Sequence, residues 1–235
     1  MTKQKRAFIA AAICLMAVGS FGRGSQSSQC QGTQDQRTKD EMALRAALNR
    51  GGLREAAKLK GHYVAEYDPH WWCLQPDVET LTKNSVAVII GRFRKKLDAR
   101  IPDSRVIFTD YEVSVDELIK GDLKQAKTIV ITLPGGRIDF EDGTSAEQTT
   151  PTFEQARIGR TYTLFLTIEN AVPSVYFLMG GPQGMIDIDD SSVVKSHGKE
   201  DDRSVLEIKG QNRETFLKNI RELARKWPDP GKCCD

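Results

Sequence analysis

The order of apolar and polar residues predicts two consecutive β-strands between Ser85 and Gly121. Residues 86–90, Val-Ala-Val-Ile-Ile, form an unbroken apolar run, which is typical of a strand covered on both faces. Residues 107–115 alternate instead, so we expect a second strand with one face in solvent. The alternation slips at Asp116 and Glu117, which predicts a β-bulge or the end of the strand there.

Four more segments have the pattern of short strands separated by turns. They are residues 128–133, 162–168, 175–179 and 185–188, with glycine-rich turns at 134–136 and 180–184. Several short strands joined by turns are typical of a barrel or a sandwich rather than of a βαβ sheet. Residues 139–152 are acidic and rich in threonine, and they predict a long exposed loop.

Helical patterns flank the strands on both sides. Residues 40–49 and 53–60 each favour a short helix, and Gly51-Gly52 separates the two. Near the carboxyl end, four residues at helical spacing predict an amphipathic helix across the strands: Phe216, Ile220, Leu223 and Trp227. Residues 191–203 indicate a polar linker, and residues 205–208 an edge strand.

The amino-terminal residues have the three-part pattern of a secretory signal peptide. Lys3, Lys5 and Arg6 precede an apolar run from Ala7 to Val18, and small residues follow. The run is shorter than the ~20 residues of a spanning helix, so cleavage is favoured over an uncleaved membrane anchor. We therefore expect an exported protein, periplasmic or secreted, without stable membrane insertion after cleavage.

Removal of residues 1–22 changes both the charge balance and the cysteine count. The formal balance of 34 cations and 32 anions becomes 31 and 32, so we expect no nucleic-acid partner. Of the five cysteines, four stay in the mature chain, and an even number in an exported protein favours disulfides: Cys30, Cys73, Cys233 and Cys234. Three connectivities are open.

Four stretches carry a resemblance to a known group of proteins. They are FTDYEVSVDELIKG, ITLPGG, PTFEQARIGRTYTLFL and YFLMGGPQGMIDI, within residues 85–189. Together they resemble uncharacterised exported bacterial proteins whose β-domain is similar to an OB-like or netrin-like barrel. The chain departs from that group at Gly159-Arg160, where an acidic residue usually follows the glycine, and at Ile186, which is usually aromatic.

The resemblance implies a mainly β fold with added helices (α+β): a small OB-like antiparallel β-barrel of five to six strands. Netrin-like barrels also occur in tissue inhibitors of metalloproteinases, but their amino-terminal cysteine has no counterpart here. The expected division of the chain is a signal peptide (1–22), a disordered tether (23–38), a helical and aromatic-rich segment (39–82), the OB-like β-barrel (83–197), and an edge strand, helix and Cys-Cys tail (198–235).

Candidate chemistry is sparse. His62, His70 and Cys73 are weak candidates for metal ligands, since their spacing is no recognised ligand pattern and surface histidines with a disulfide are favoured. The acidic run from Asp187 to Asp190 offers oxygens to calcium, but a solvated strand end is the better interpretation. With three histidines in the chain and no Gly-x-Ser-x-Gly elbow, no catalytic residues are assigned.

An aromatic group is the remaining candidate site. It could stack against sugar rings or a partner's side chains, although core packing is favoured: Tyr63, Tyr67, Trp71 and Trp72. The leading hypothesis is an exported, non-enzymatic binding or envelope-structural protein without a cofactor, whose partner is a protein or a cell-envelope component. The alternatives are a netrin-like protease inhibitor acting through barrel-edge loops such as Asp139–Thr152, and a metal-dependent hydrolase built on the weak metal candidates.

Overall fold

The computed structural model describes residues 28–68, 71, 73–151, 153–168, 175–189, 192–198, 203–229 and 231. The predicted signal peptide lies outside these residues. They fall into two compact units, of which the first holds only the start of helix α1, up to Met42. The second unit, from Ala43 onward, carries every other described element.

The described fold is mixed α+β, with ten strands in two sheets and four α-helices. The helices are α1 (Ser28–Lys60), α2 (Val78–Asn84), α3 (Arg203–Ile208) and α4 (Arg213–Lys226), with a 3₁₀ turn η1 (Gly181–Gly184). The strands are β1 (His62–Glu66), β2 (Ala87–Arg100), β3 (Phe108–Lys120), β4 (Thr128–Pro134), β5 (Gly136–Asp139), β6 (Ser145–Thr149), β7 (Thr161–Ile168), β8 (Val175–Leu178), β9 (Met185–Asp187) and β10 (Lys195–Ser196).

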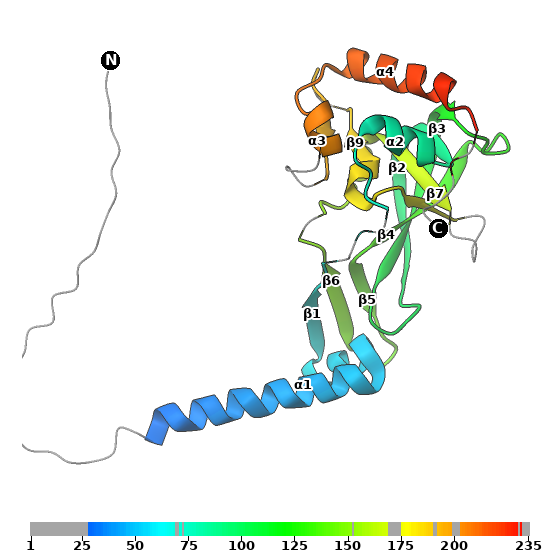
Figure 1. The fold of residues 1–235 in the computed structure, drawn as a ribbon. Helices are drawn as coiled ribbons and strands as arrows, with labels where there is room; N and C mark the ends of the chain where they lie inside the picture. The colour runs from blue at the N-terminus through cyan, green and yellow to red at the C-terminus, as the bar shows by residue number, and fades with distance from the viewer. Residues whose placement is uncertain are drawn as a thin grey trace, which may run out of the picture. The chain divides into compact units, whose positions relative to one another are not determined.

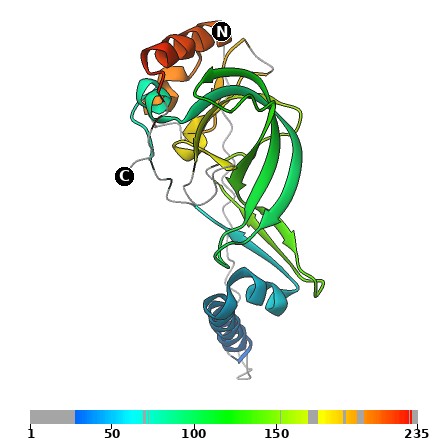
Figure 2. The ribbon, with the colours of Figure 1, turned by 90° about the vertical axis from the view of Figure 1, so that its right-hand side faces the viewer.

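The larger sheet closes into a ring. Its strand order is β10-β9-β7-β2-β3-β4-β8, and an additional pairing of β7 with β8 joins the two sides. All neighbours in the ring are antiparallel except β4 and β8, which run parallel. Figure 2 shows the long strands β2 and β3 curving strongly around it.

The apolar run in β2 is buried on both faces, as its sequence predicts. Ala87, Ile89 and Phe93 point into a cluster inside the ring, where Tyr111 and Leu164 also lie. The residues between them, Val88 and Ile90, contact a second cluster on the outer face. Because the side-chain period of a strand is two, one unbroken apolar run supplies both clusters.

The predicted irregularity in β3 is confirmed as a β-bulge. Ile90 pairs with Glu117 and the next residue, Gly91, pairs with Val115, so Asp116 has no counterpart on β2. The strand does not end there but continues to Lys120. A further shift in β2 leaves Arg94 as an extra residue. Such bulges bend a strand and increase its twist, which suits closure of the sheet.

Three helices cover the outer face of the ring at one end (Figure 1). The predicted amphipathic helix is present as α4, with Phe216 and Ile220 fully buried in the outer cluster beside Leu81 of α2. Residues 203–208 form α3 and not the expected edge strand. Val205 and Ile208 are buried three residues apart, a spacing that places both side chains on one face of a helix.

The expected loop at residues 139–152 is instead part of a second sheet. β5 and β6 form an antiparallel hairpin, and β1 pairs in parallel with β6 to give the order β1-β6-β5. Apolar residues are few in the hairpin, but Ala146 is fully buried and packs with Leu53 and Ala57 of α1. A small buried residue under a helix gives little hydrophobic signal in the sequence.

Helix α1 begins at Ser28, within residues that the sequence assigns to a disordered tether, and is kinked where two helices were expected to part. Gly52 has a φ of 65°, and a side chain there would meet the backbone oxygen of Ser104. The amide of Leu53 donates a 2.8 Å hydrogen bond to that same oxygen. The glycine therefore allows the close approach that anchors the second part of α1.

Candidate functional site

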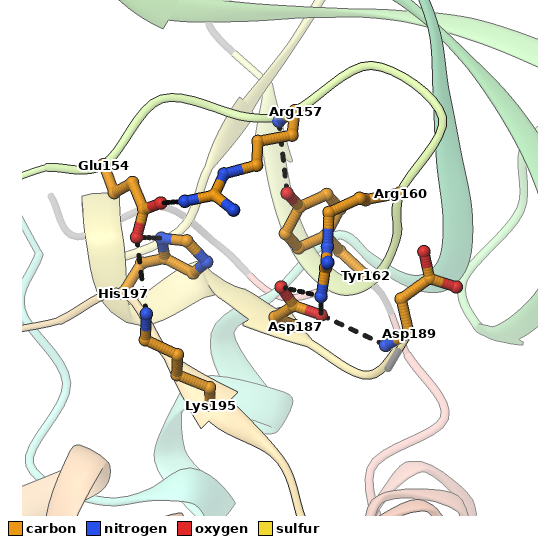
Figure 3. Close-up of polar contacts among 8 residues, drawn as sticks. All are labelled: Glu154, Arg157, Arg160, Tyr162, Asp187, Asp189, Lys195 and His197. Atoms are coloured by element: carbon orange, nitrogen blue, oxygen red, sulfur yellow. Dashed lines mark hydrogen bonds and ion pairs between the residues drawn. The ribbon is translucent and has the colours of Figure 1, made fainter. Parts of the chain in front are cut away.

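A cluster of charged and polar side chains joins three segments of the larger sheet (Figure 3). It gathers residues from the loop after β6, from β7 and β9, and from the segment around β10: Glu154, Arg157, Arg160, Tyr162, Asp187, Asp189, Lys195 and His197. We call it the histidine cluster. Its histidine lies within residues 191–203, whose polar sequence predicts a linker and gives no sign of a site.

His197 is the unusual member, because its side chain is only 4% exposed. Neither ring nitrogen has a hydrogen-bond partner among the described residues. Nδ1 lies 4.0 Å from Oε2 of Glu154, and the ring makes an edge contact with Tyr162 at 5.8 Å between centroids. Burial lowers the pKa of His197, since the charged imidazolium would lose its hydration, although Glu154 and Asp187 oppose this.

Three ion pairs frame the histidine. The guanidinium of Arg160 contacts the carboxylate of Asp187 at 2.9 Å, and that carboxylate also accepts the backbone N–H of Asp189. On the other side, Glu154 contacts Arg157 and lies 3.5 Å from the ammonium of Lys195. These contacts hold the segment that carries His197 against the sheet, where β10 adds a two-residue pairing with β9.

The enclosure of the ring limits its chemistry. An imidazole with this little exposure presents no nitrogen to an external substrate, and the hydroxyl of Tyr162 already accepts the backbone N–H of Arg157. In this conformation the histidine cluster joins segments and can take up a proton. The apolar pair Val193-Val194 before it is the one sequence signal for a packed segment, and Val194 is buried.

A second buried ionisable group lies on the same sheet. Lys120, the last residue of β3, is 3% exposed, and its ammonium donates three hydrogen bonds to backbone carbonyls at the end of α2: Thr82 (2.7 Å), Lys83 (2.7 Å) and Ser85 (2.9 Å). A cation at a helix carboxyl end is favourable. Burial nevertheless lowers the pKa of Lys120 to about 8, with Asp229 opposing the shift.

A run of exposed cations lies on β2. Arg92, Arg94, Lys95 and Lys96 are all exposed, and none makes an ion pair within the described chain. Beyond Phe93, β2 pairs with β3 but no longer with β7, so this half of the strand has one paired edge among the described strands. We call these four residues the basic run.

The predicted aromatic group is divided between two regions. Tyr63 packs with the small sheet, where it joins the cluster of Leu53 and Ala57. Trp71 packs on the interior of the ring, 5.7 Å from the ring of Phe153, and Trp72 lies outside the described residues. Tyr67 follows β1 and donates its backbone N–H to Thr149.

The weak metal candidates are also apart where they are described. His62 lies on β1, with Nδ1 2.8 Å from the hydroxyl of Ser145, whereas Cys73 packs against the outer cluster under the helices. His70 lies outside the described residues. Within the described ranges, no group of three or more His, Cys, Asp or Glu side chains could hold a metal ion.

The structure describes only part of the predicted set of disulfide cysteines. Cys30 lies in α1, and Cys233 and Cys234 fall outside the described residues. The part of the chain that the structure describes contains no disulfide bond, so the proposed pairing stays a prediction.

Comparison with known proteins gives no assignment. No protein-family model matches the chain, and no curated protein matches it. Among the helices that the structure describes, none has the length and apolar character needed to cross a membrane.

Proposed function

We propose that this chain is an exported, non-enzymatic binding protein whose ring of strands is an OB-like barrel. Around the ring, β2, β3, β4, β8 and β7 follow one another, which makes the order first-second-third-fifth-fourth with a parallel third and fifth strand. This order supports the assignment, because the OB-fold is a five-stranded Greek-key barrel. OB-folds bind oligosaccharides and oligonucleotides on their strands and adjoining loops. The fold alone does not select one of these ligands, so the choice is argued from the residues on the surface.

The basic run carries the proposal. Four exposed cations lie within five consecutive residues of the first barrel strand, a length of about 13 Å at the rise of an extended chain. Their charges add over this distance, since screening at physiological salt acts over about 8 Å. The fitting ligand is a polymer with regularly repeated negative charges, and for an exported protein this is an acidic polysaccharide of the cell envelope.

The single aromatic residue of the run argues against single-stranded nucleic acid. Phe93 is fully buried inside the ring, with its ring 5.5 Å from that of Tyr111. Proteins that bind single strands without sequence preference combine cations with exposed aromatic rings on which bases stack. The basic run offers charge without such a platform, which suits carboxylates on a sugar chain.

The test measures binding of purified mature protein to immobilised polygalacturonate at 50 mM salt. The triple variant Arg92→Gln, Arg94→Gln, Lys95→Gln should bind at least tenfold more weakly than the wild type. The wild-type affinity should fall as salt rises, because the contact is electrostatic.

A matched control removes two arginines and one lysine from the exposed face of α4: Arg213→Gln, Lys218→Gln and Arg225→Gln. We expect this variant to stay within twofold of the wild type. Equal losses of affinity in the two triple variants would mean that binding depends on the net charge of the protein and not on the basic run. Tighter binding to a DNA oligonucleotide than to polygalacturonate would overturn the choice of polymer, and absence of binding at 50 mM salt would overturn the proposal.

A further inference from the structure

A polar cleft opens beside the last residue of the basic run. Its volume is about 280 Å³, and it lies between β2 and the hairpin of the small sheet. Lys96 and Arg137 bring two cations to its lining, and Phe153 contributes an apolar surface. The cleft is close in size to the smaller ligand sites of proteins, which start near 300 Å³.

Three polar groups in the lining make no side-chain hydrogen bond or ion pair with the described residues. The hydroxyl of Thr150 is buried without a hydrogen-bond partner. The ammonium of Lys96 and the carboxamide of Gln155 likewise make no hydrogen bond or ion pair with the described residues. A buried hydroxyl without a partner destabilises the fold, so an occupant that bonds to it would remove that cost.

The turn between β4 and β5 lies beside these groups, and its two glycines have no side chain that would crowd them. A Cβ atom at Gly135 would lie 3.2 Å from the hydroxyl oxygen of Thr150 and 3.0 Å from the amide nitrogen of Gln155. A Cβ at Gly136 would collide with the hydroxyl oxygen of Thr109 and would lie 3.8 Å from the ammonium of Lys96. Both glycines have positive φ, at 92° and 120°, so the backbone as well as the space disfavours a side chain.

The charge of the cleft is positive on balance. Arg137 bonds to Asp139 at 2.9 Å, and the lining carboxylate of Glu147 lies across from Arg137 in the sheet and 3.9 Å from Nε2 of His62. Lys96 is therefore the cation without a carboxylate of its own. A ligand that satisfies the cleft needs one negative group for this ammonium and neighbouring hydroxyls for the threonine and the glutamine.

We propose that this cleft binds a single sugar acid, with its carboxylate on Lys96 and its hydroxyls on Thr150 and Gln155. The inference rests on the proposed function and deepens it, since such a sugar acid is the repeating or terminal unit of the polymer that the basic run attracts. The basic run supplies long-range attraction, and the cleft supplies recognition of one unit.

Free D-galacturonate is titrated into the isotope-labelled mature protein, and backbone amide shifts are followed by NMR, with D-galactose and inorganic phosphate as comparison ligands. We expect saturable shifts at residues 135–137 and 148–150 with galacturonate, and at least tenfold weaker binding of the other two. Equal binding of galactose would overturn the role of the carboxylate, and equal binding of phosphate would overturn the role of the hydroxyls.

Variants separate the cleft from general effects. Lys96→Met should weaken galacturonate binding at least tenfold and Thr150→Val about fourfold. Two matched controls should stay within 1.5-fold: Lys218→Met, an exposed lysine on α4, and Thr167→Val, which removes another buried hydroxyl without a partner in the described chain. Full affinity in Lys96→Met and Thr150→Val would overturn the site.

The outcome for the polymer is read separately. If polygalacturonate still binds through Arg92, Arg94 and Lys95 while free galacturonate causes no shift, the sugar-acid cleft is wrong and the proposed function stands. If neither the polymer nor the monomer binds, both are wrong.

Discussion

Lys120 and His197 both have an ionisable group that is buried in the fold, yet the surroundings of the two groups differ completely. The lysine ammonium has three donors and uses them on three carbonyls. The histidine has two ring nitrogens without a hydrogen bond to a described residue. Burial therefore does not decide whether an ionisable group stabilises a fold; the partners it finds do so.

The difference follows from where each group meets the backbone. The last carbonyls of a helix have no partner within the helix, so the end of α2 offers acceptors to Lys120. His197 lies beside strands whose backbone groups already pair with one another, and its neighbours Arg160 and Asp187 are occupied by their own ion pair. One group is held at a helix end, and the other is enclosed among satisfied partners.

The largest expected effect comes from removing the satisfied cation. Lys120→Met keeps the length of the side chain but leaves carbonyls at the end of α2 without their donor, and we expect a loss of about 3 kcal/mol in the free energy of unfolding. Urea unfolding at pH 7 measures it. Lys218→Met on the exposed face of α4 should stay within about 0.5 kcal/mol, and an equal loss in the two variants would contradict the comparison.

The lowered pKa of Lys120 also makes the free energy of unfolding depend on pH. The pKa of this lysine in the folded protein is about 8, below its ordinary value of 10.5. Between these values the unfolded chain holds more protons at this position than the folded one, so the free energy of unfolding rises with pH in that window. The wild type should gain stability relative to Lys120→Met between pH 8 and 10, whereas parallel profiles would contradict the lowered pKa.

The smallest effect is expected at His197. Because its pKa in the folded protein lies below 6.5, the unfolded chain takes up a proton first as the pH falls, and the wild type loses stability below pH 6.5. His197→Phe cannot titrate and keeps an aromatic ring against Tyr162. At pH 7 it should lie within about 1 kcal/mol of the wild type.

At pH 5 the stability of the phenylalanine variant relative to the wild type should be higher than it is at pH 7. His197→Gln serves as a second variant, because it also lacks the titration but does not add volume. Thermal unfolding at the two pH values measures both. A wild-type profile that stays flat from pH 7 to pH 5 would show that the imidazole titrates normally when folded.

The sequence was most informative where one residue pattern has one structural solution. The apolar run of β2 predicted a strand buried on both faces, and the broken alternation at Asp116 predicted the bulge. It was least informative where burial depends on distant partners. The β5–β6 hairpin looks like an acidic loop, since its burial depends on α1, and α3 looks like a strand because six residues hold too few turns to show a helical period.

The candidate sites follow the same rule. His197 looks like part of a linker, because the segments that enclose it begin more than forty residues earlier at Glu154. The basic run is visible as Arg-Phe-Arg-Lys-Lys in the sequence, but the burial of its phenylalanine and the pairing of its strand along one edge are properties of the folded chain. The cleft beside Lys96 is lined by three segments that are apart in the sequence, so no local sequence pattern predicts it.

The parallel pairing of β1 with β6 also has a consequence for the order of assembly. His62 and Ser145 are 83 residues apart, whereas β5 and β6 are joined by a short turn. Closing the longer loop costs about 2 kcal/mol more in chain entropy, so the hairpin forms first and β1 joins a sheet that already exists. In pulse-labelled hydrogen exchange, the amides of β1 should gain protection after those of β5 and β6, which makes this edge the last part of the small sheet to be completed.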